Sequence, residues 1–281
     1  MKPLIGRDSI DKHGLWYAHR FLILRRLSQL SVIVLFLLGP LFGVWIIEGN
    51  MASSLLFGTV PLSDPYIVTQ LAVAGHLPEF NALLGVAIIA ALYWLFGGRT
   101  YCSWVCPINA ITDLASFLRR TFGINSNVKV NKNTRHVLLV ATLLTPLLVG
   151  YVAWELINPV SILNRGIIFG IGYGWLLIVT IFAFDLFIMR NGWCGHLCPM
   201  GAFYSLLGKK SLLTIKTTNR EACNQCGDCY MVCPEPQVLK QPLRNQEHAK
   251  AVISSDCTRC GRCIDVCAPD VFTLDFTKTE K

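Results

Sequence analysis

Eight of the twelve cysteines in this chain lie near the C-terminus in two copies of one spacing. The first copy reads Cys223-x2-Cys226-x2-Cys229-x3-Cys233-Pro234, and the second reads Cys257-x2-Cys260-x2-Cys263-x3-Cys267-Ala268-Pro269. This spacing is typical of bacterial 4Fe-4S sites, in which the fourth cysteine of each run serves the other cluster. We therefore assign one cluster to Cys223, Cys226, Cys229 and Cys267, and the second to Cys257, Cys260, Cys263 and Cys233.

Each run also contains a glycine, Gly227 or Gly261. A loop wrapped around a cubane needs positive φ and close backbone approach, which glycine allows. Zinc is the alternative metal, because CxxC pairs also bind zinc. Zinc sites use four ligands per ion in two pairs, whereas this duplicated spacing suits two cubanes. We expect two 4Fe-4S clusters, with iron bound by the eight cysteines.

The other four cysteines form a second duplicated motif, Cys102-x3-Cys106-Pro107 and Cys194-x3-Cys198-Pro199. Each copy follows an apolar stretch and precedes an apolar run with basic residues at its end, 108–120 or 200–210. Proline pushes the preceding cysteine out of helical conformation and suits the start of a helix. The predicted repeat is therefore two membrane spans, CxxxCP and an amphipathic helix on the cytoplasmic surface.

A cysteine at a helix N-terminus is favoured as a thiolate, which ligates metals or does redox chemistry. If the two repeats face each other across a pseudo-two-fold axis, the four sulfurs meet in a third metal site. Otherwise they act as two redox dithiol pairs, and a purely structural role for buried cysteines is the remaining alternative. The residues concerned are Cys102, Cys106, Cys194 and Cys198.

Long apolar stretches must position these motifs. The chain has 281 residues, of which 53% are hydrophobic and only 15% are charged, too apolar for an ordinary soluble domain. Four stretches, 28–48, 79–98, 136–157 and 167–189, reach the roughly 20 residues that a helix needs to cross a bilayer. Prolines break residues 51–78, which we predict to be re-entrant or surface-lying. The predicted fold class is a membrane α-helical domain of four transmembrane helices in two tandem repeats, plus a small α+β two-cluster bacterial-type ferredoxin domain.

Charge predicts the orientation, because Lys and Arg collect on the cytoplasmic side. Residues 1–27 contain six, 49–78 none, 99–135 six, 158–166 one, and the chain from Arg190 onward twelve. Both termini are therefore predicted to be cytoplasmic. The predicted domains are a basic N-terminus (1–27), the membrane domain (28–210) and the ferredoxin domain (211–281). The net charge of +8 reflects this topology, and without a basic stripe it indicates no nucleic-acid binding.

A ferredoxin tethered to a membrane suggests a lipid-soluble electron donor, and quinol is the expected substrate. Quinol oxidation needs a proton acceptor, and ionisable groups in membranes are functional candidates. The candidates in or beside the spans are Glu48, Asp64, His76, Glu79, Glu155 and Asp185. We predict Asp185 as the proton acceptor, since it is the most deeply embedded of these.

The combined motifs resemble the NapH-type ferredoxin proteins over nearly the whole chain. The resemblance rests on the basic N-terminus, the four spans, the CxxxCP motifs at 102–107 and 194–199, and the cluster motifs at 223–234 and 257–267. It implies a quinol dehydrogenase membrane subunit in a bacterial inner membrane that delivers electrons toward periplasmic nitrate reductase. It also implies a periplasmic ferredoxin-type partner and a membrane-anchored multihaem cytochrome. Relatives in nitrous oxide reduction, methylamine utilisation and oxidase assembly share the design.

An assembly or metal-handling factor is the alternative function. In that reading the CxxxCP thiols bind and transfer a metal, and the clusters supply electrons. The electron path also stays open, because the clusters are predicted on the cytoplasmic side and the implied acceptor lies across the membrane. Either the electrons return through the CxxxCP region and the quinone site, or the clusters serve another role, such as the maturation of a partner.

Overall fold

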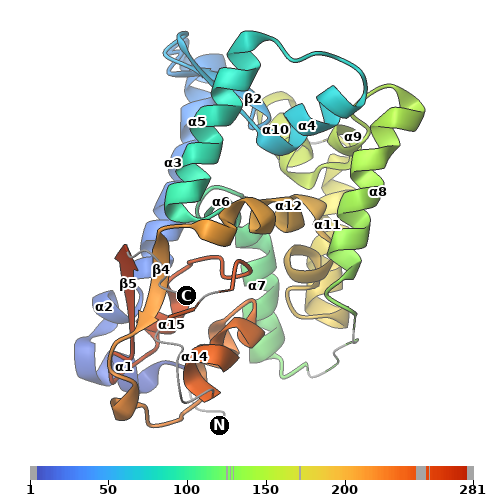
Figure 1. Cartoon of the computed structure of the whole chain (residues 1–281). Helices are drawn as coiled ribbons and strands as arrows, with labels where there is room; N and C mark the ends of the chain where they lie inside the picture. Colours follow the sequence, from blue (N-terminus) through green and yellow to red (C-terminus); the bar gives the residue numbers. More distant parts are fainter. Residues whose placement is uncertain are drawn as a thin grey trace. The chain divides into compact units, whose positions relative to one another are not determined.

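The computed structural model describes residues 5–124, 126, 128, 130–170, 172–244, 251–252 and 254–276. The chain is mostly helical and divides into two compact units (Figure 1). The ferredoxin unit comprises residues 1–28, 93–105 and 205–281, and the helical unit comprises residues 29–92 and 106–204.

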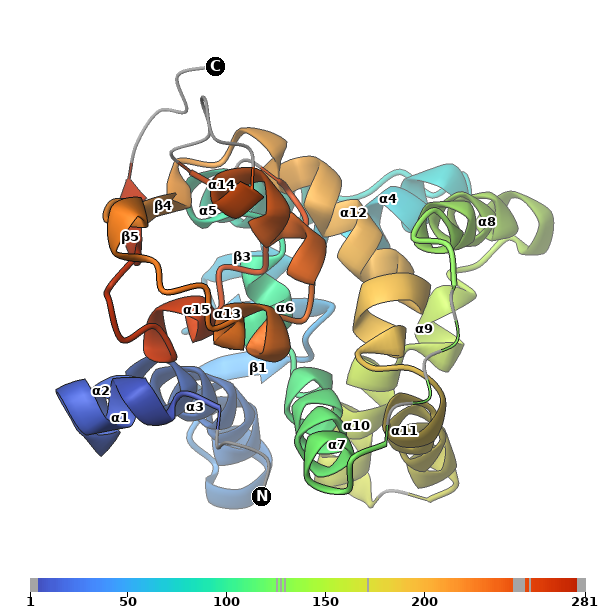
Figure 2. The same ribbon diagram turned by 90° about the horizontal axis from the view of Figure 1, so that it is seen from below.

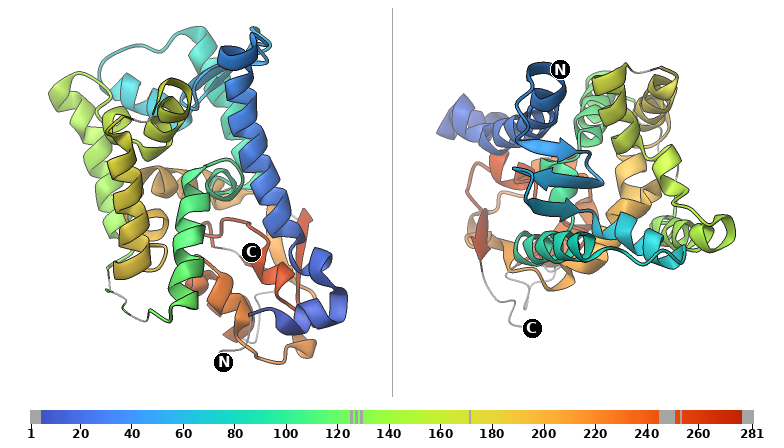
Figure 3. Two further views of the ribbon diagram at one scale, coloured as in Figure 1. Left: turned by 180° about the vertical axis from the view of Figure 1, so that it is seen from behind. Right: turned by 90° about the horizontal axis from the view of Figure 1, so that it is seen from above.

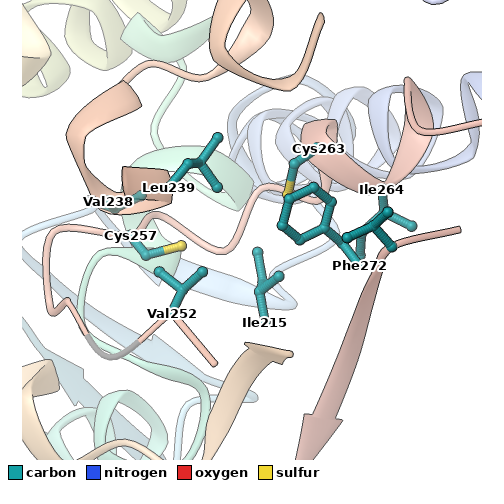
Figure 4. Close-up of a cluster of buried hydrophobic side chains, with 9 residues drawn as sticks. Ile215, Val238, Leu239, Val252, Cys257, Cys263, Ile264 and Phe272 are labelled. Carbon is teal, nitrogen blue, oxygen red and sulfur yellow. The ribbon is translucent and has the colours of Figure 1, made fainter. Parts of the chain in front are cut away.

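A two-stranded antiparallel sheet forms the base of the ferredoxin unit. Strand β4 (Leu213–Thr217) pairs with β5 (Phe272–Phe276) along its whole length. Helices α13 (Asp228–Val232) and α15 (Arg262–Asp265) each follow the glycine of one cysteine loop and pack side by side (Figure 2). Figure 4 shows the core between the sheet and the loops, which includes Ile215, Val238, Leu239, Val252, Ile264 and Phe272. The unit also contains η3 (Gly208–Lys210), η4 (Arg220–Ala222), η5 (Pro236–Leu239) and α14 (Lys240–Arg244).

The N-terminal segment packs with the cysteine loops. It contains α1 (Arg7–His13), α2 (Leu15–Ala18) and the first turns of α3 (Arg20–Phe42). The Ser9 hydroxyl donates to the carbonyl oxygen of Asp265 over 2.7 Å. The Asp265 carboxylate accepts from the backbone N–H groups of Phe21 (3.2 Å) and Leu22 (3.1 Å). Asp265 therefore caps the N-terminus of α3, although it comes from a distant segment.

The order of elements repeats along the chain. The first series is α3, α4 (Pro65–Val73), α5 (Phe80–Phe96), α6 (Thr100–Trp104) and α7 (Ile108–Thr121). The second series is α8 (Thr134–Val149), α9 (Trp154–Ile157), α10 (Pro159–Phe169), α11 (Gly174–Ala183), the π-helical turns η1 (Phe184–Ile188) and η2 (Trp193–Leu197), and α12 (Pro199–Leu207). The helices α7 and α12 were expected after the two CxxxCP motifs, and both are present.

The duplication extends to the caps of two short helices. Asp64 precedes Pro65 at the start of α4, and Asn158 precedes Pro159 at the start of α10. The Asp64 side chain accepts from the N–H of Tyr66 over 2.8 Å, and the Asn158 side chain accepts from the N–H of Val160 over 3.1 Å. Proline suits the first position of a helix, and Asp and Asn are good N-caps.

A three-stranded antiparallel meander precedes α4 and was not predicted. Its strands are β1 (Ile47–Gly49), β2 (Ser53–Leu56) and β3 (Val60–Ser63), and Figure 3 shows them side by side. α4 then packs against α8. Residues 51–78 are therefore an ordered hairpin and helix.

Among the described residues, one helix, Arg20–Phe42, is long and apolar enough to cross a membrane. The shorter apolar helices are Phe80–Phe96, Thr134–Val149, Pro159–Phe169 and Gly174–Ile188. Three of the predicted spans are not continuous helices. The helix in 28–48 ends at Phe42, the helix in 136–157 ends at Val149, and 167–189 is interrupted after Phe169. Each end is followed by a glycine with positive φ, namely Gly43 (70°), Gly150 (76°) and Gly170 (91°), a conformation that terminates helices.

Candidate iron–sulfur site

Both cysteine loops of the ferredoxin unit have the same backbone shape. The residue before the second cysteine has positive φ, 57° at Gln225 and 50° at Arg259. The glycine after that cysteine also has positive φ, 84° at Gly227 and 73° at Gly261, as predicted. Two left-handed residues around one cysteine turn the chain sharply, which shortens the distance between the first and third cysteines of each loop.

The fourth cysteine of each run lies near sulfurs of the other run. Burial raises the pKa of the Cys229 thiol to about 12, and the nearby sulfurs that raise it further are those of Cys226, Cys267 and Cys223. Burial likewise raises the pKa of Cys233, and its neighbouring sulfurs are those of Cys260 and Cys257. Cys267 therefore lies with the first loop and Cys233 lies with the second.

The donor set fits iron–sulfur chemistry. All twelve cysteines are free of disulfide bonds, and Cys257, Cys260 and Cys263 are buried. A buried thiol ionises only when a positive charge is near, and bound iron supplies that charge. In the part of the chain that the structure describes, no three His, Cys, Asp or Glu side chains are placed to hold a single metal ion.

The first CxxxCP motif contacts the second cysteine loop within the ferredoxin unit. The Ser103 hydroxyl donates to the carbonyl oxygen of Thr258 over 2.7 Å. The Trp104 indole N–H donates to the carbonyl oxygen of Arg259 over 3.2 Å. Both donors come from the three residues after Cys102, and both acceptors lie between Cys257 and Cys260. The motif and the loop are thus joined directly through hydrogen bonds.

A buried ion pair reinforces this contact. Arg99 and Glu235 are each 1% exposed, and their Nη1 and Oε1 atoms are 2.8 Å apart. Arg99 also donates to the carbonyl oxygen of Asp256 over 2.8 Å. Burial disfavours the guanidinium charge, but Glu235 and the Cys102 thiol outweigh burial and raise the pKa of Arg99. Sequence reasoning missed this pair, because its members are 136 positions apart and neither belongs to a motif.

Arg259 was also missed as a structural residue of the site. Its side chain is 3% exposed and donates to the carbonyl oxygens of Leu213 (2.6 Å) and Cys257 (3.2 Å). A Cβ on Gly97 would overlap the Arg259 guanidinium, and Gly97 has φ of 98°. The tight turn at Gly97, just before the first CxxxCP motif, is therefore shaped to receive this side chain.

The four CxxxCP cysteines are divided between the units. Cys102 belongs to the ferredoxin unit, where burial raises the pKa of its thiol and the Arg99 charge opposes that rise. Cys106, Cys194 and Cys198 belong to the helical unit. Cys198 is extended, with ψ of 111°, directly before α12, as its proline predicts. The Cys194 sulfur lies 3.7 Å from the Thr112 hydroxyl of α7. A four-sulfur site stays a prediction.

Asp185 is fully buried in η1. One carboxylate oxygen accepts from the backbone N–H of Trp193 over 3.0 Å, where the second motif begins. The Arg119 guanidinium donates to the carbonyl oxygens of Asp185 (3.3 Å) and Leu186 (2.7 Å). Asp185 thus caps η2, and its role as a proton acceptor stays a prediction.

Comparison with known proteins matches all of these regions. A family model described as a 4Fe-4S binding domain matches residues 79–125 and again 171–216, which contain the two CxxxCP motifs. A model described as a 4Fe-4S dicluster domain matches residues 215–268. The ferredoxin-type protein NapH of Escherichia coli is 51% identical, over 96% of this chain and 94% of the relative.

Two further relatives have similar coverage. The ferredoxin-type protein NapH of Haemophilus influenzae is 51% identical over 95% of this chain and 93% of the relative. The methylamine utilization ferredoxin-type protein MauN of Methylorubrum extorquens is 45% identical over 95% of this chain and 93% of the relative. No solved structure matches the chain.

Proposed function

We propose, because the chain belongs to the NapH family of ferredoxin-type proteins, that it oxidises quinol in the membrane and passes the electrons toward a periplasmic nitrate reductase. Its iron–sulfur electron-transfer character follows from the family and the two kinds of 4Fe-4S domain. In enzymatic terms it is the electron-transfer subunit of a quinol dehydrogenase.

The eight ferredoxin cysteines are the proposed ligands of two 4Fe-4S clusters, which carry one electron at a time. The spatial grouping of the thiols supports the crossed assignment, with Cys267 in the first set and Cys233 in the second. Each loop has two left-handed residues and supplies three thiolates of one set, and the other run supplies the fourth. The apolar core around Cys257 and Cys263 keeps water from the second set.

The single observation that carries the proposal is the contact between the first CxxxCP motif and the second cysteine loop. Arg99, Ser103 and Trp104 donate to three carbonyl oxygens that flank Cys257, those of Asp256, Thr258 and Arg259. Electron transfer weakens steeply with distance, so direct hydrogen bonding between the two motifs shortens the path. This contact makes the cluster of Cys233, Cys257, Cys260 and Cys263 the entry point for electrons from the membrane side.

The proposed setting is an inner membrane with four spans and both termini cytoplasmic. The long apolar helix Arg20–Phe42 and four shorter apolar helices support this setting. The proposed partners are a periplasmic ferredoxin-type protein and a membrane-anchored multihaem cytochrome. In this arrangement the electrons re-cross the membrane through the CxxxCP region to reach a periplasmic acceptor.

Reduction by quinol tests the proposal. The protein is purified anaerobically, placed in lipid nanodiscs and mixed with a short-chain quinol, while the visible absorbance of the clusters is followed. We expect the clusters to bleach with quinol as the only reductant. Clusters that dithionite reduces but quinol never reduces would rule out the donor. Copper bound by the CxxxCP cysteines and lost in Cys102→Ser would instead favour the metal-handling function.

A further inference from the structure

A buried polar cluster lies in the helical unit at the start of α4. Asp64 is 6% exposed, and its second carboxylate oxygen accepts a hydrogen bond from the Tyr204 hydroxyl over 2.7 Å. Tyr204 lies on α12, which begins directly after Cys198. The acid before α4 and the helix after the second CxxxCP motif therefore meet in one place, although they are 140 positions apart.

Tyr66 and Gln70 extend the cluster along α4. They are one helical turn apart on the same face, and both are fully buried. The Tyr66 hydroxyl lies 2.6 Å from the hydroxyl of Thr142. Neither the Nε2 nor the Oε1 of Gln70 completes a hydrogen bond of good geometry with a described residue. The Tyr66 hydroxyl is close enough to interact with this amide, but a buried amide with incomplete hydrogen bonds is costly, which indicates that a ligand completes them.

The surroundings of Tyr66 suit a flat, mostly apolar ring with oxygen substituents. Its ring centroid lies 5.2 Å from that of Phe203 and 6.3 Å from that of Trp154. Aromatic side chains at these separations pack well against a further ring. The Gln70 amide offers both a donor and an acceptor, so it can bond to a quinone carbonyl or to a quinol hydroxyl.

The second repeat shows that α4 does not need an acid as its cap. Asn158 caps α10 through the same kind of hydrogen bond that Asp64 gives to α4. Asn and Asp cap helices about equally well. The carboxylate at position 64 therefore has a use beyond the cap.

Burial raises the pKa of Asp64 to about 6, and the Tyr204 hydroxyl and the backbone N–H groups limit the rise. Glu155 adds a small further increase and is itself within 3.5 Å of Arg165. Tyr66 stays protonated, because burial raises the pKa of its phenol; the Cys198 thiol is also close enough to raise it. A carboxylate of this kind is ionised near neutral pH and accepts protons readily.

We propose, on the basis of the proposed function, that Asp64, Tyr66, Gln70 and Tyr204 bind the quinol head group and that Asp64 accepts its protons. Oxidation of one quinol to a quinone breaks two O–H bonds. The two protons pass in turn to a carboxylate oxygen of Asp64 and on to water. The two electrons leave separately to the 4Fe-4S clusters. Cys198 next to Tyr66 places the second CxxxCP motif beside this site.

The test compares Asp64→Asn, which keeps a cap, with Asp185→Asn at the rival acid and with Asp11→Asn, which changes an acid that is 70% exposed on α1. The initial rate of cluster bleaching by a short-chain quinol is measured in nanodiscs on both sides of pH 6. In the wild type we expect the rate to rise with pH through about 6, as Asp64 loses its proton. Asp64→Asn should lower the rate at neutral pH by about 100-fold and abolish the rise. Asp11→Asn should leave both unchanged, and dithionite should bleach all four proteins equally.

Gln70→Leu separates binding from folding. Removing an unsatisfied buried amide should leave the unfolding midpoint unchanged or raise it, while the KM for quinol rises several-fold. An Asp64→Asn protein with the wild-type rate and pH profile, or a loss confined to Asp185→Asn, would overturn the assignment of Asp64. A wild-type protein that quinol does not reduce would overturn the proposed function, and the site with it.

Discussion

The two glycines of the cysteine loops have the same backbone conformation but different surroundings. A Cβ on Gly261 would overlap the ring of Phe21, whereas a Cβ on Gly227 would meet nothing within 4 Å. Phe21 belongs to the first turn of α3, so the second loop packs against the start of the long apolar helix. The first loop has no such neighbour among the described residues.

Alanine at these positions should therefore have unequal effects. Both substitutions place a side chain in the left-handed region, at a cost of about 1–2 kcal/mol. Gly261→Ala also forces Phe21 to move, so it should lower the urea midpoint further and lose iron from the second cluster. Iron content and cluster absorbance during urea unfolding measure both effects. Equal losses for Gly227→Ala and Gly261→Ala would contradict the packing of Phe21 on this loop.

At the scale of single residues, the sequence predicted the cysteines and glycines because their spacing is local. It did not reveal Arg99, Glu235 or Arg259. Each of these acts through partners far along the chain, such as Glu235 for Arg99 and Leu213 for Arg259. An isolated arginine after an apolar stretch is ordinarily a membrane-end residue, so no local signal marked Arg99 as half of a buried pair.

Among the elements, the junction of α3 with the ferredoxin unit depends on a cap from another segment. The carboxylate of Asp265 accepts from two of the first N–H groups of α3. The Gly6 N–H donates to the Asp228 carboxylate over 2.8 Å, which adds a second tie to the first cysteine loop. The N-terminal segment is therefore fixed to both loops.

Asp265→Ala should loosen this junction, whereas Asp265→Asn should preserve it. Loss of a capping side chain costs about 0.5–2 kcal/mol, and Asn caps nearly as well as Asp. We expect trypsin to cleave Asp265→Ala faster within residues 7–20 than it cleaves the wild type or Asp265→Asn. The same cleavage rate in all three proteins would show that the cap does not hold α3. Iron content serves as the control for an intact cluster.

The sequence predicted helices after both CxxxCP motifs, and the structure contains α7 and α12 there. Hydropathy located the apolar helices but misplaced several ends, because an apolar run does not show where a glycine takes positive φ. Gly43, Gly150 and Gly170 stop helices inside stretches that looked continuous. The meander of β1, β2 and β3 was missed because its strands have only three or four residues each, too few for a clear alternation of polar and apolar residues.

For the whole molecule, three separate stretches of chain build the unit that contains the eight ferredoxin cysteines. This unit combines the C-terminal cysteine loops with the N-terminal residues and with residues 93–105, the stretch that contains Cys102. Cys102 is thus part of the same compact unit as the ferredoxin cysteines. The predicted topology places residues 49–78 on the far side of the membrane. To test it, an epitope is inserted in the β2–β3 turn, and its accessibility to an antibody is measured in intact spheroplasts.

The most direct test of the account removes one cluster at a time and asks whether quinol still reduces the other. Cys226→Ser removes a proposed ligand of the first cluster, and Cys260→Ser removes a proposed ligand of the second. The account predicts that quinol still bleaches the remaining cluster of Cys226→Ser. In Cys260→Ser, quinol should bleach the remaining cluster at least about tenfold more slowly, while dithionite still reduces it. The opposite result would contradict the account. If quinol bleached Cys260→Ser rapidly but failed to bleach Cys226→Ser, electrons would not enter through the cluster beside Cys102.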